Sequence, residues 1–143
     1  MIGGVTDTEG LATLERLVQF AGQRHRLIVN NIANLDTPGY RPTDVSVKDF
    51  QKQLGDAVDE RRRTGRLSGP LDLKDSAQVE FSPHSLVLHP TPIGENILFH
   101  DGNDRDLERT MQDLVENFLT FRLASELLRN RFDLLRTAIA ERV

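Results

Sequence analysis

The chain has 143 residues, a formal net charge of -4 at pH 7 and no cysteine. This length fits one domain or one elongated unit, and the missing thiols exclude disulfide bonds, thiol catalysis and cysteine-based zinc sites. Aromatic residues make up only 6% of the chain, which argues against a deep aromatic substrate pocket, and the negative charge argues against nucleic acid or an acidic membrane as a partner.

A long helix is predicted over residues 8–34. Its apolar residues recur at alternating steps of three and four, the period of a helix that packs along one stripe against another helix. Pro38 ends the helix, because the residue before a proline is pushed out of α geometry. We call the stripe the seam and expect these members to contact the second long helix of the same chain: Leu11, Leu14, Val18, Ile28 and Ile32.

A type II turn is predicted directly after this helix. Pro38 fixes φ at the second position of the turn and Gly39 accepts a positive φ at the third. Three asparagines in the last helical turns are poor helix formers whose amides can bond the backbone. From residue types alone, a frayed helix end followed by an ordinary turn is the favoured interpretation.

The middle of the chain, residues 41–103, is predicted to be rich in loops. Five of the six prolines lie here. Phe50, Leu54 and Val58 have helical spacing and indicate one short helix, and residues 97–99 fit a short strand or extended arm. The rest has too few apolar residues to order itself and is interpreted as loop or conditional structure.

A second long helix is predicted over residues 104–142, with no glycine or proline in it. Its seam positions alternate four and three without a slip, and Ser125 is the only polar residue among them. The seam on this helix is expected to comprise Leu107, Met111, Leu114, Phe118, Phe121, Leu128, Phe132, Leu135 and Ile139.

Each long helix also carries a second apolar set away from its seam. A helix that is apolar on two sides must be covered on two sides, and a partner helix covers only one. We therefore expect contacts between subunits at Leu17, Phe20, Leu27, Leu119, Leu123, Leu127 and Leu134. The alternative is that residues 41–103 fold over these second faces.

The predicted fold is mainly α. Two long terminal helices pair as an antiparallel, coiled-coil-like hairpin, and a loop-rich middle segment with one short helix connects them. The chain then divides into an N-terminal helix and turn (residues 1–40), the middle segment (41–103) and a C-terminal helix (104–143).

The remaining polar clusters do not predict an enzyme. No two histidines stand four apart on a helix, and the chain has no phosphate-binding loop or serine nucleophile motif. The run at residues 61–63 is interpreted as a solvated arginine face paired with nearby acids. We expect no catalytic, cofactor-binding or metal-binding residue and no cofactor; the histidines considered were His25, His84, His89 and His100.

The helix end and turn resemble the N-terminal signature of flagellar rod, hook and hook-associated axial proteins. The matching residues are Asn30, Asn31, Ile32, Ala33, Asn34, Thr37, Pro38, Gly39 and Tyr40. Residues 101–111 and 126–139 are similar to the last helix of a short proximal member of the flagellar basal body rod protein family. Leu35 and Asp36 replace the small-Asn pair common in that signature, which puts a side-chain role at these two positions in doubt.

This resemblance implies a structural subunit of the proximal rod, a torque-transmitting drive shaft and export channel that crosses the periplasm. It implies export by the flagellar type III apparatus without a cleaved signal peptide. The implied partners are copies of the chain itself, other proximal rod proteins, the ring-to-rod adaptor and the inner-membrane MS ring, with no nucleic acid and no small-molecule substrate. The alternative is a soluble coiled-coil adaptor or export chaperone of a type III secretion system.

Overall fold

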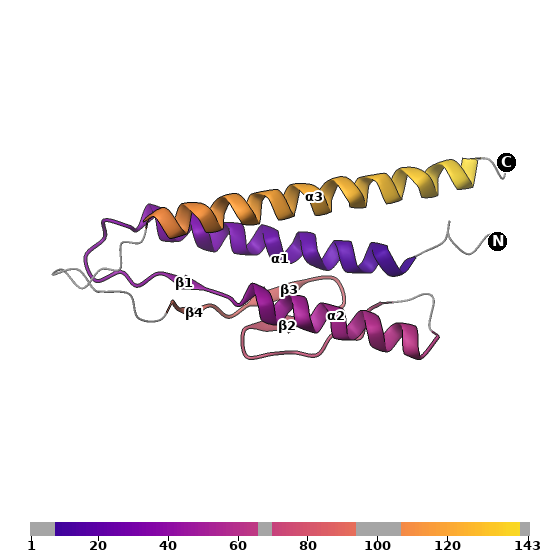
Figure 1. The fold of residues 1–143 in the computed structure, drawn as a ribbon, viewed down its shortest axis with the longest axis horizontal. Coiled ribbons are helices and arrows are strands. Elements are labelled where there is room, and N and C mark those ends of the chain that lie inside the picture. The colour runs from indigo at the N-terminus through magenta and orange to yellow at the C-terminus, as the bar shows by residue number, and fades with distance from the viewer. Residues whose placement is uncertain (1–7, 66–69, 94–106, 141–143) are drawn as a thin grey trace.

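The computed structural model describes residues 8–65, 70–93 and 107–140. Within these ranges the chain forms three layers: α3 on one side, α1 in the middle, and α2 with four short strands on the far side of α1 (Figure 1). The elements in chain order are α1 (Thr8–Ala33), β1 (Thr43–Asp44), α2 (Val47–Arg63), β2 (Val79–Phe81), β3 (Leu86–Leu88), β4 (Thr91–Pro92) and α3 (Leu107–Ala140).

The two long helices, α1 and α3, run antiparallel and pack together (Figure 1). This confirms the predicted mainly α fold with paired terminal helices. α1 ends at Ala33, one residue before the predicted end, and the described part of α3 begins at Leu107. None of the helices in the described ranges is long and apolar enough to cross a membrane.

The middle segment is more ordered than predicted. α2 extends over 17 residues, beginning where the Ser46 hydroxyl accepts a hydrogen bond of 3.1 Å from the Asp49 backbone N–H. Such an N-cap satisfies one of the amides that a helix leaves unbonded at its start. α2 ends with the arginine run, and positive charge is stabilising there because the C-terminal end of the helix dipole is negative. Arg63 pairs with Glu60 on the surface as expected, but Arg61 is buried, so the run is not wholly solvated.

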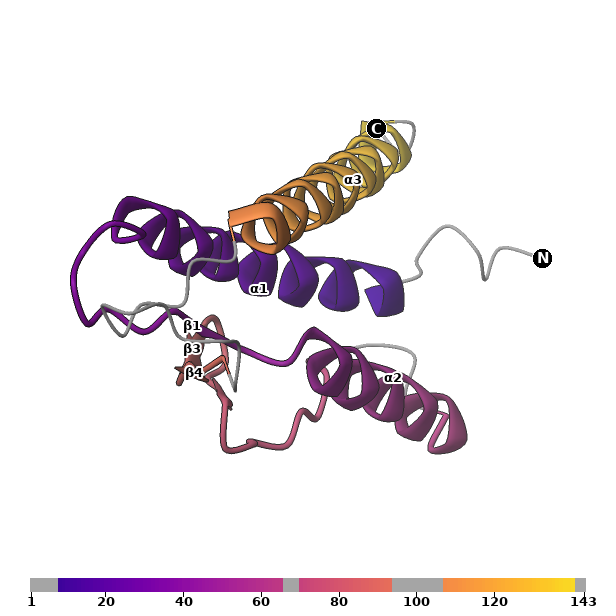
Figure 2. The same cartoon turned by 60° about the vertical axis from the view of Figure 1, so that its left-hand side comes forward.

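The strands form two small antiparallel sheets. β1 pairs with β4, aligning Thr43 with Pro92, and β2 pairs with β3, aligning Phe81 with Leu86. The β2–β3 hairpin lies against α1, on the side turned away from α3 (Figure 2). The strand or arm predicted at residues 97–99 lies outside the described residues.

The main core lies between α1, α2 and the β2–β3 hairpin. Phe20 of α1 is 2% exposed and stacks on Phe50 of α2 with ring centroids 3.9 Å apart and planes within 5°. Stacked aromatic pairs add to the free energy gained from burial. The other buried members of this core are Val45, Leu54, Ala57, Leu71, Val79 and Leu86.

This core corrects the expectation that other subunits cover the second face of α1. Phe20 is buried inside the chain, and Leu17 and Leu27 pack against the same core. The middle segment provides this cover despite its few apolar residues, because α2 and the hairpin turn most of theirs toward α1. The alternative considered from the sequence, that the middle segment folds over a second face, therefore holds for α1.

The predicted seam of α3 was also wrong in its placement. α3 meets α1 along a stripe whose buried members are Asn117 and Ala124. The Asn117 amide donates a hydrogen bond of 2.9 Å to the Ala21 carbonyl. Most predicted seam residues of α3 lie beside this stripe and are exposed, namely Leu107, Met111, Phe118, Phe121, Phe132 and Ile139.

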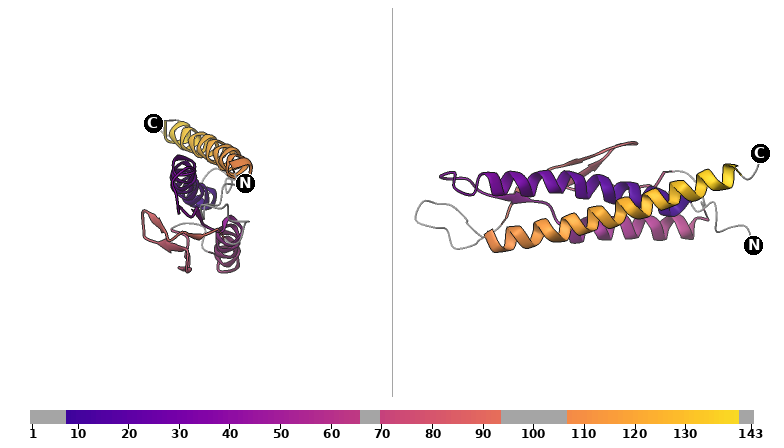
Figure 3. Two further views of the ribbon diagram at one scale, coloured as in Figure 1. Left: turned by 90° about the vertical axis from the view of Figure 1, so that its left-hand side faces the viewer. Right: turned by 90° about the horizontal axis from the view of Figure 1, so that it is seen from above.

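The remaining seam residues are buried or partly buried. Ile28 is buried, whereas partial burial is found at Leu11, Leu14, Val18, Ile32, Leu114, Leu128 and Leu135. The predicted seam and the observed contact of α3 differ because a straight helix has 3.6 residues per turn. A stripe of side chains that repeats every 3.5 residues therefore moves around such a helix by about 20° per heptad. Figure 3 shows that α3 crosses α1 instead of following it, so one apolar stripe does not stay at the contact.

Candidate assembly surface

The end of α1 is tied to the following strand by the side chain of Asn31. Its amide donates a hydrogen bond of 2.8 Å to the Thr43 carbonyl. Its carbonyl oxygen accepts bonds from the Tyr40 hydroxyl at 2.8 Å and the Thr43 backbone N–H at 3.2 Å. Asn31 is buried, and a buried amide whose donor and acceptor are both bonded fixes the local geometry. The chain therefore leaves α1 in one defined direction.

The predicted turn forms between Thr37 and Tyr40. The Tyr40 backbone N–H donates a hydrogen bond of 3.1 Å to the Thr37 carbonyl, and Gly39 has a φ of 73°. These are the features of a type II turn. Asn30 donates a bond of 3.1 Å to the Tyr40 hydroxyl and Asn34 donates one of 2.9 Å to the Asn30 carbonyl, so all three asparagines take part in the junction.

Replacing Gly39 with alanine is expected to lower the free energy of unfolding by about 1 kcal/mol, because a Cβ is strained at positive φ. Gly55→Ala is the matched control. Gly55 lies inside α2, and no side chain or neighbouring segment comes within 4 Å of the place that a Cβ would take, so alanine there should stabilise by about 0.5–1 kcal/mol. Urea unfolding of both variants checks this pair, and a loss at Gly55 equal to that at Gly39 would contradict the turn argument.

Arg24 joins all three layers of the fold. From α1, its guanidinium bonds Asp44 of β1 at 2.5 and 2.9 Å and lies 3.5 Å from Asp113 of α3. Burial acts to lower the pKa of Arg24, but the hydrogen bond and charge of Asp44, aided by Asp113, outweigh it and raise the pKa above its ordinary value. Arg24 therefore stays charged over the whole physiological pH range.

Sequence reasoning missed this cluster, because nothing local links the three residues. Arg24→Met is expected to lower the free energy of unfolding by about 2 kcal/mol, between the values for exposed and for fully buried ion pairs. Asp44 and Asp113 remain partly exposed, which reduces the loss. Arg26→Met, at an exposed position nearby, should change stability by less than about 0.5 kcal/mol. Thermal unfolding compares the two variants, and equal losses would contradict the role of the cluster.

A row of polar side chains on α1 holds the β2–β3 hairpin. Arg16 donates bonds of 2.8 to 2.9 Å to three hairpin carbonyls, including that of Ser85. Gln19 donates to the His84 carbonyl at 3.1 Å, and Gln23 donates to the Leu86 carbonyl. The hairpin is therefore fixed on α1 through its turn and through the start of β3.

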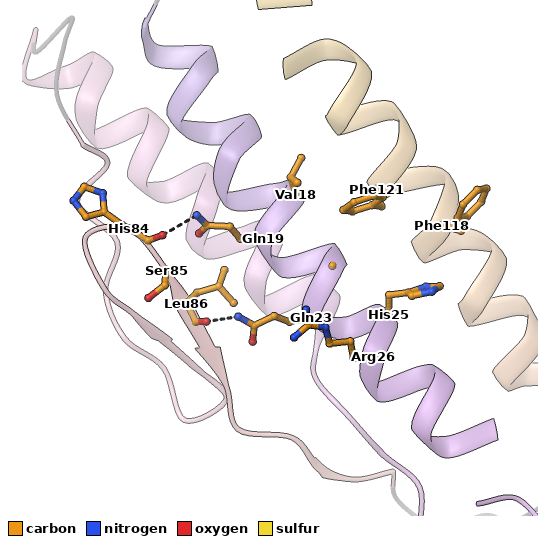
Figure 4. A pocket seen from close by; sticks show the side chains of 11 residues that line it. Val18, Gln19, Gln23, His25, Arg26, His84, Ser85, Leu86, Phe118 and Phe121 are labelled. Atoms are coloured by element: carbon orange, nitrogen blue, oxygen red, sulfur yellow. Dashed lines mark hydrogen bonds between the residues drawn. The ribbon is translucent and has the colours of Figure 1, made fainter. Parts of the chain in front are cut away.

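A groove of about 560 Å3 lies between α1, this hairpin and α3 (Figure 4). Phe121 is directed from α3 toward α1. On the hairpin side of the groove, Gln19 and Gln23 donate hydrogen bonds to hairpin carbonyls. The lining also contains Gly22, whose missing side chain leaves room for the Phe121 ring. The other lining residues are Val18, His25, Arg26, His84, Ser85, Leu86 and Phe118.

The outer sides of α3 carry large apolar side chains that no described residue buries. The second-face residues of α3, expected to contact other subunits, are all exposed: Leu119, Leu123, Leu127 and Leu134. Together with the exposed seam residues they leave α3 apolar on both flanks. Monomeric proteins rarely expose contiguous apolar surface of this kind, which marks interaction sites. We call the exposed apolar residues of α3 the assembly surface.

In the described ranges, no group of three or more histidine and acidic side chains is placed to hold an ion. His25 and His84 lie on the groove instead of meeting each other. His100, which was considered with them, lies outside the described residues.

An elongated antiparallel helix pair that is covered on one side and exposes large apolar side chains on the other is typical of a structural subunit. No family model matches the chain. It is 24% identical to the flagellar basal body rod protein FlgB of Bacillus subtilis over 90% of the chain and 92% of that protein. It is 30% identical to FlgB of Salmonella typhimurium over 80% of each, and 28% identical to FlgB of Yersinia enterocolitica over 75% and 76%.

The chain belongs to the family of flagellar basal body rod proteins FlgB. It is accordingly a structural component of the flagellar basal body rod, and its relatives are structural proteins.

Proposed function

We propose that this chain is a subunit of the proximal rod, packing by its helices into a torque-transmitting shaft that encloses an export channel. The observation that carries the proposal is the assembly surface of α3. Burying such apolar area stabilises association by roughly 25 cal/mol per Å2. α1 is sandwiched between α3 and the middle segment (Figure 1), so α3 is the long helix left to meet neighbouring chains.

A shaft that transmits torque needs subunits that do not deform under load. Arg24 clamps β1 and α3 to α1, and Asn31 fixes the exit from α1. Satisfied buried polar networks of this kind rigidify a fold. The resemblance supports the finer parts of the proposal: contacts with the ring-to-rod adaptor, MS ring and other proximal rod proteins, a path across the periplasm, and export by the type III apparatus without a cleaved signal peptide.

Purified basal bodies test this function directly. A strain lacking the native gene should regain swimming when the chain is supplied, and an epitope on the chain should be detected in the rod close to the inner-membrane ring. The N-terminal sequence of the assembled protein should begin without loss of a leader. Swimming in the absence of the chain, or basal bodies that do not contain it, would overturn the proposal.

A soluble adaptor or export chaperone is the second candidate, and the core around Phe20 and Phe50 favours it, because this core forms within one chain. Circular dichroism of the dilute monomer separates the two. A rod subunit should gain helix content when it assembles, whereas a chaperone should show the full helix content and one cooperative melt as the free chain.

A further inference from the structure

We propose that the groove between α1, the β2–β3 hairpin and α3 receives the α3 helix of a neighbouring copy. The inserted part is the ridge formed by Leu119 and Leu123. This inference rests on the proposed function, since it requires that copies of the chain pack together, and it specifies which two surfaces meet.

The groove is preformed and apolar at its base. Val18, Leu86, Phe118 and Phe121 line it. The Gln19 and Gln23 side chains bond hairpin carbonyls, which fixes the hairpin on α1 and keeps the groove in shape (Figure 4). A surface that is already shaped loses less conformational entropy when a partner binds.

The ridge lies on the opposite flank of α3. Leu119 and Leu123 are 57% and 63% exposed. They stand four residues apart, so they are neighbours on one row of the helix surface. At 3.6 residues per turn, Leu123 lies about 160° around the helix axis from Phe121, which lines the groove. A chain therefore cannot place its own ridge in its own groove, whereas the groove of another copy is open to it.

One pair of opposite charges gives this arrangement an expected register. Glu116, Arg122 and Glu126 are exposed and lie within one helical turn of the ridge leucines. The rim of the groove carries the exposed Arg26, with His25 and His84 also on its lining. The Glu126 carboxylate beside the ridge and the Arg26 guanidinium on the groove rim are opposite in charge, and such a pair can set the partner and the register.

The two surfaces differ, so the contact joins unlike patches of identical chains. Contacts of this kind do not close on themselves as a two-fold dimer does, and they generate rings or open helical arrays. The groove and ridge thus provide a lateral contact that repeats from one copy to the next, as a rod requires.

Charge reversal tests the pairing in a strain where the variant replaces the native chain. Arg26→Glu and Glu126→Arg should each reduce the number of basal bodies containing the chain about tenfold, because like charges then face each other. The double variant restores opposite charges and should recover most of the loss. Asp59→Arg, at an exposed position on α2, is the matched control and should leave the number unchanged. Failure of the double variant to recover would overturn the pairing.

Cysteine cross-linking gives an independent measurement, because the chain has no native cysteine. Copies with Ser85→Cys on the groove and copies with Glu126→Cys beside the ridge, expressed together, should form a disulfide-linked dimer in isolated basal bodies. Ser85→Cys with Asp59→Cys should not. If the native chain is present in basal bodies but the first pair gives no dimer, the pairing fails and the rod function stands. If the native chain is absent from basal bodies, the rod function itself fails and the pairing with it.

Discussion

Leu123→Asp should abolish incorporation of the chain into the rod while leaving the isolated chain nearly as stable as the native one. Leu123 is 63% exposed, so its replacement removes little burial from the free chain. The cost there is the lower helix propensity of aspartate, about 0.5 kcal/mol. On assembly the carboxylate would be buried against apolar surface without a partner, which costs several kcal/mol.

Two measurements are needed for this prediction. Urea unfolding of the purified variant should match the native chain within about 0.5 kcal/mol, and cells carrying the variant should neither swim nor contain the protein in basal bodies. Leu127→Asp, at another exposed second-face position, should behave alike, and Leu123→Met should assemble because it keeps the surface apolar. Normal swimming with Leu123→Asp would show that this flank of α3 contacts nothing in the rod.

Phe20→Ala should lower the free energy of unfolding by about 3–5 kcal/mol, the range for removing a buried phenylalanine. Phe20 is 2% exposed and stacks on Phe50, so the loss combines apolar burial, the ring contact and a cavity between α1 and α2. The variant should lose the α2 helix at lower urea than the native chain, followed by circular dichroism.

Phe118→Ala is the matched control, since it removes the same side chain from a position that is 48% exposed. Its expected cost in the isolated chain is below about 1 kcal/mol. Equal losses for Phe20→Ala and Phe118→Ala would mean that the core between α1 and the middle segment does not form in the free chain.

Local signals predicted the long helices and the turn well. Pro38 and Gly39 restrict their own backbone and that of their neighbours, so the end of α1 and the type II turn follow from a few adjacent residues. The apolar spacing identified both long helices because each repeats its pattern over many turns. The structure also confirms the predicted pairing of the two helices as an antiparallel hairpin.

Contacts between distant segments were predicted less well. The apolar period shows which residues need cover but not which segment provides it, so Phe20 was assigned to a neighbouring subunit when Phe50 covers it. The most buried residues of α3 at its contact with α1 are Ala124 and Asn117, and the Asn117 amide bonds the Ala21 carbonyl. Small residues and single polar bonds leave no periodic signal. The Arg24 cluster and the bonds from Arg16 to the hairpin were missed for the same reason.

The layer order gives each molecule two unlike outer sides. α3 exposes large apolar side chains among its charges, while the outer face of α2 exposes charged side chains, including Lys48, Lys52, Asp56 and Arg63, and no large apolar one. In the proposed rod, a cylinder built from such molecules would bury α3 in the packed wall and turn α2 toward water. A single copy would then already carry the difference between wall and water, before any neighbour joins.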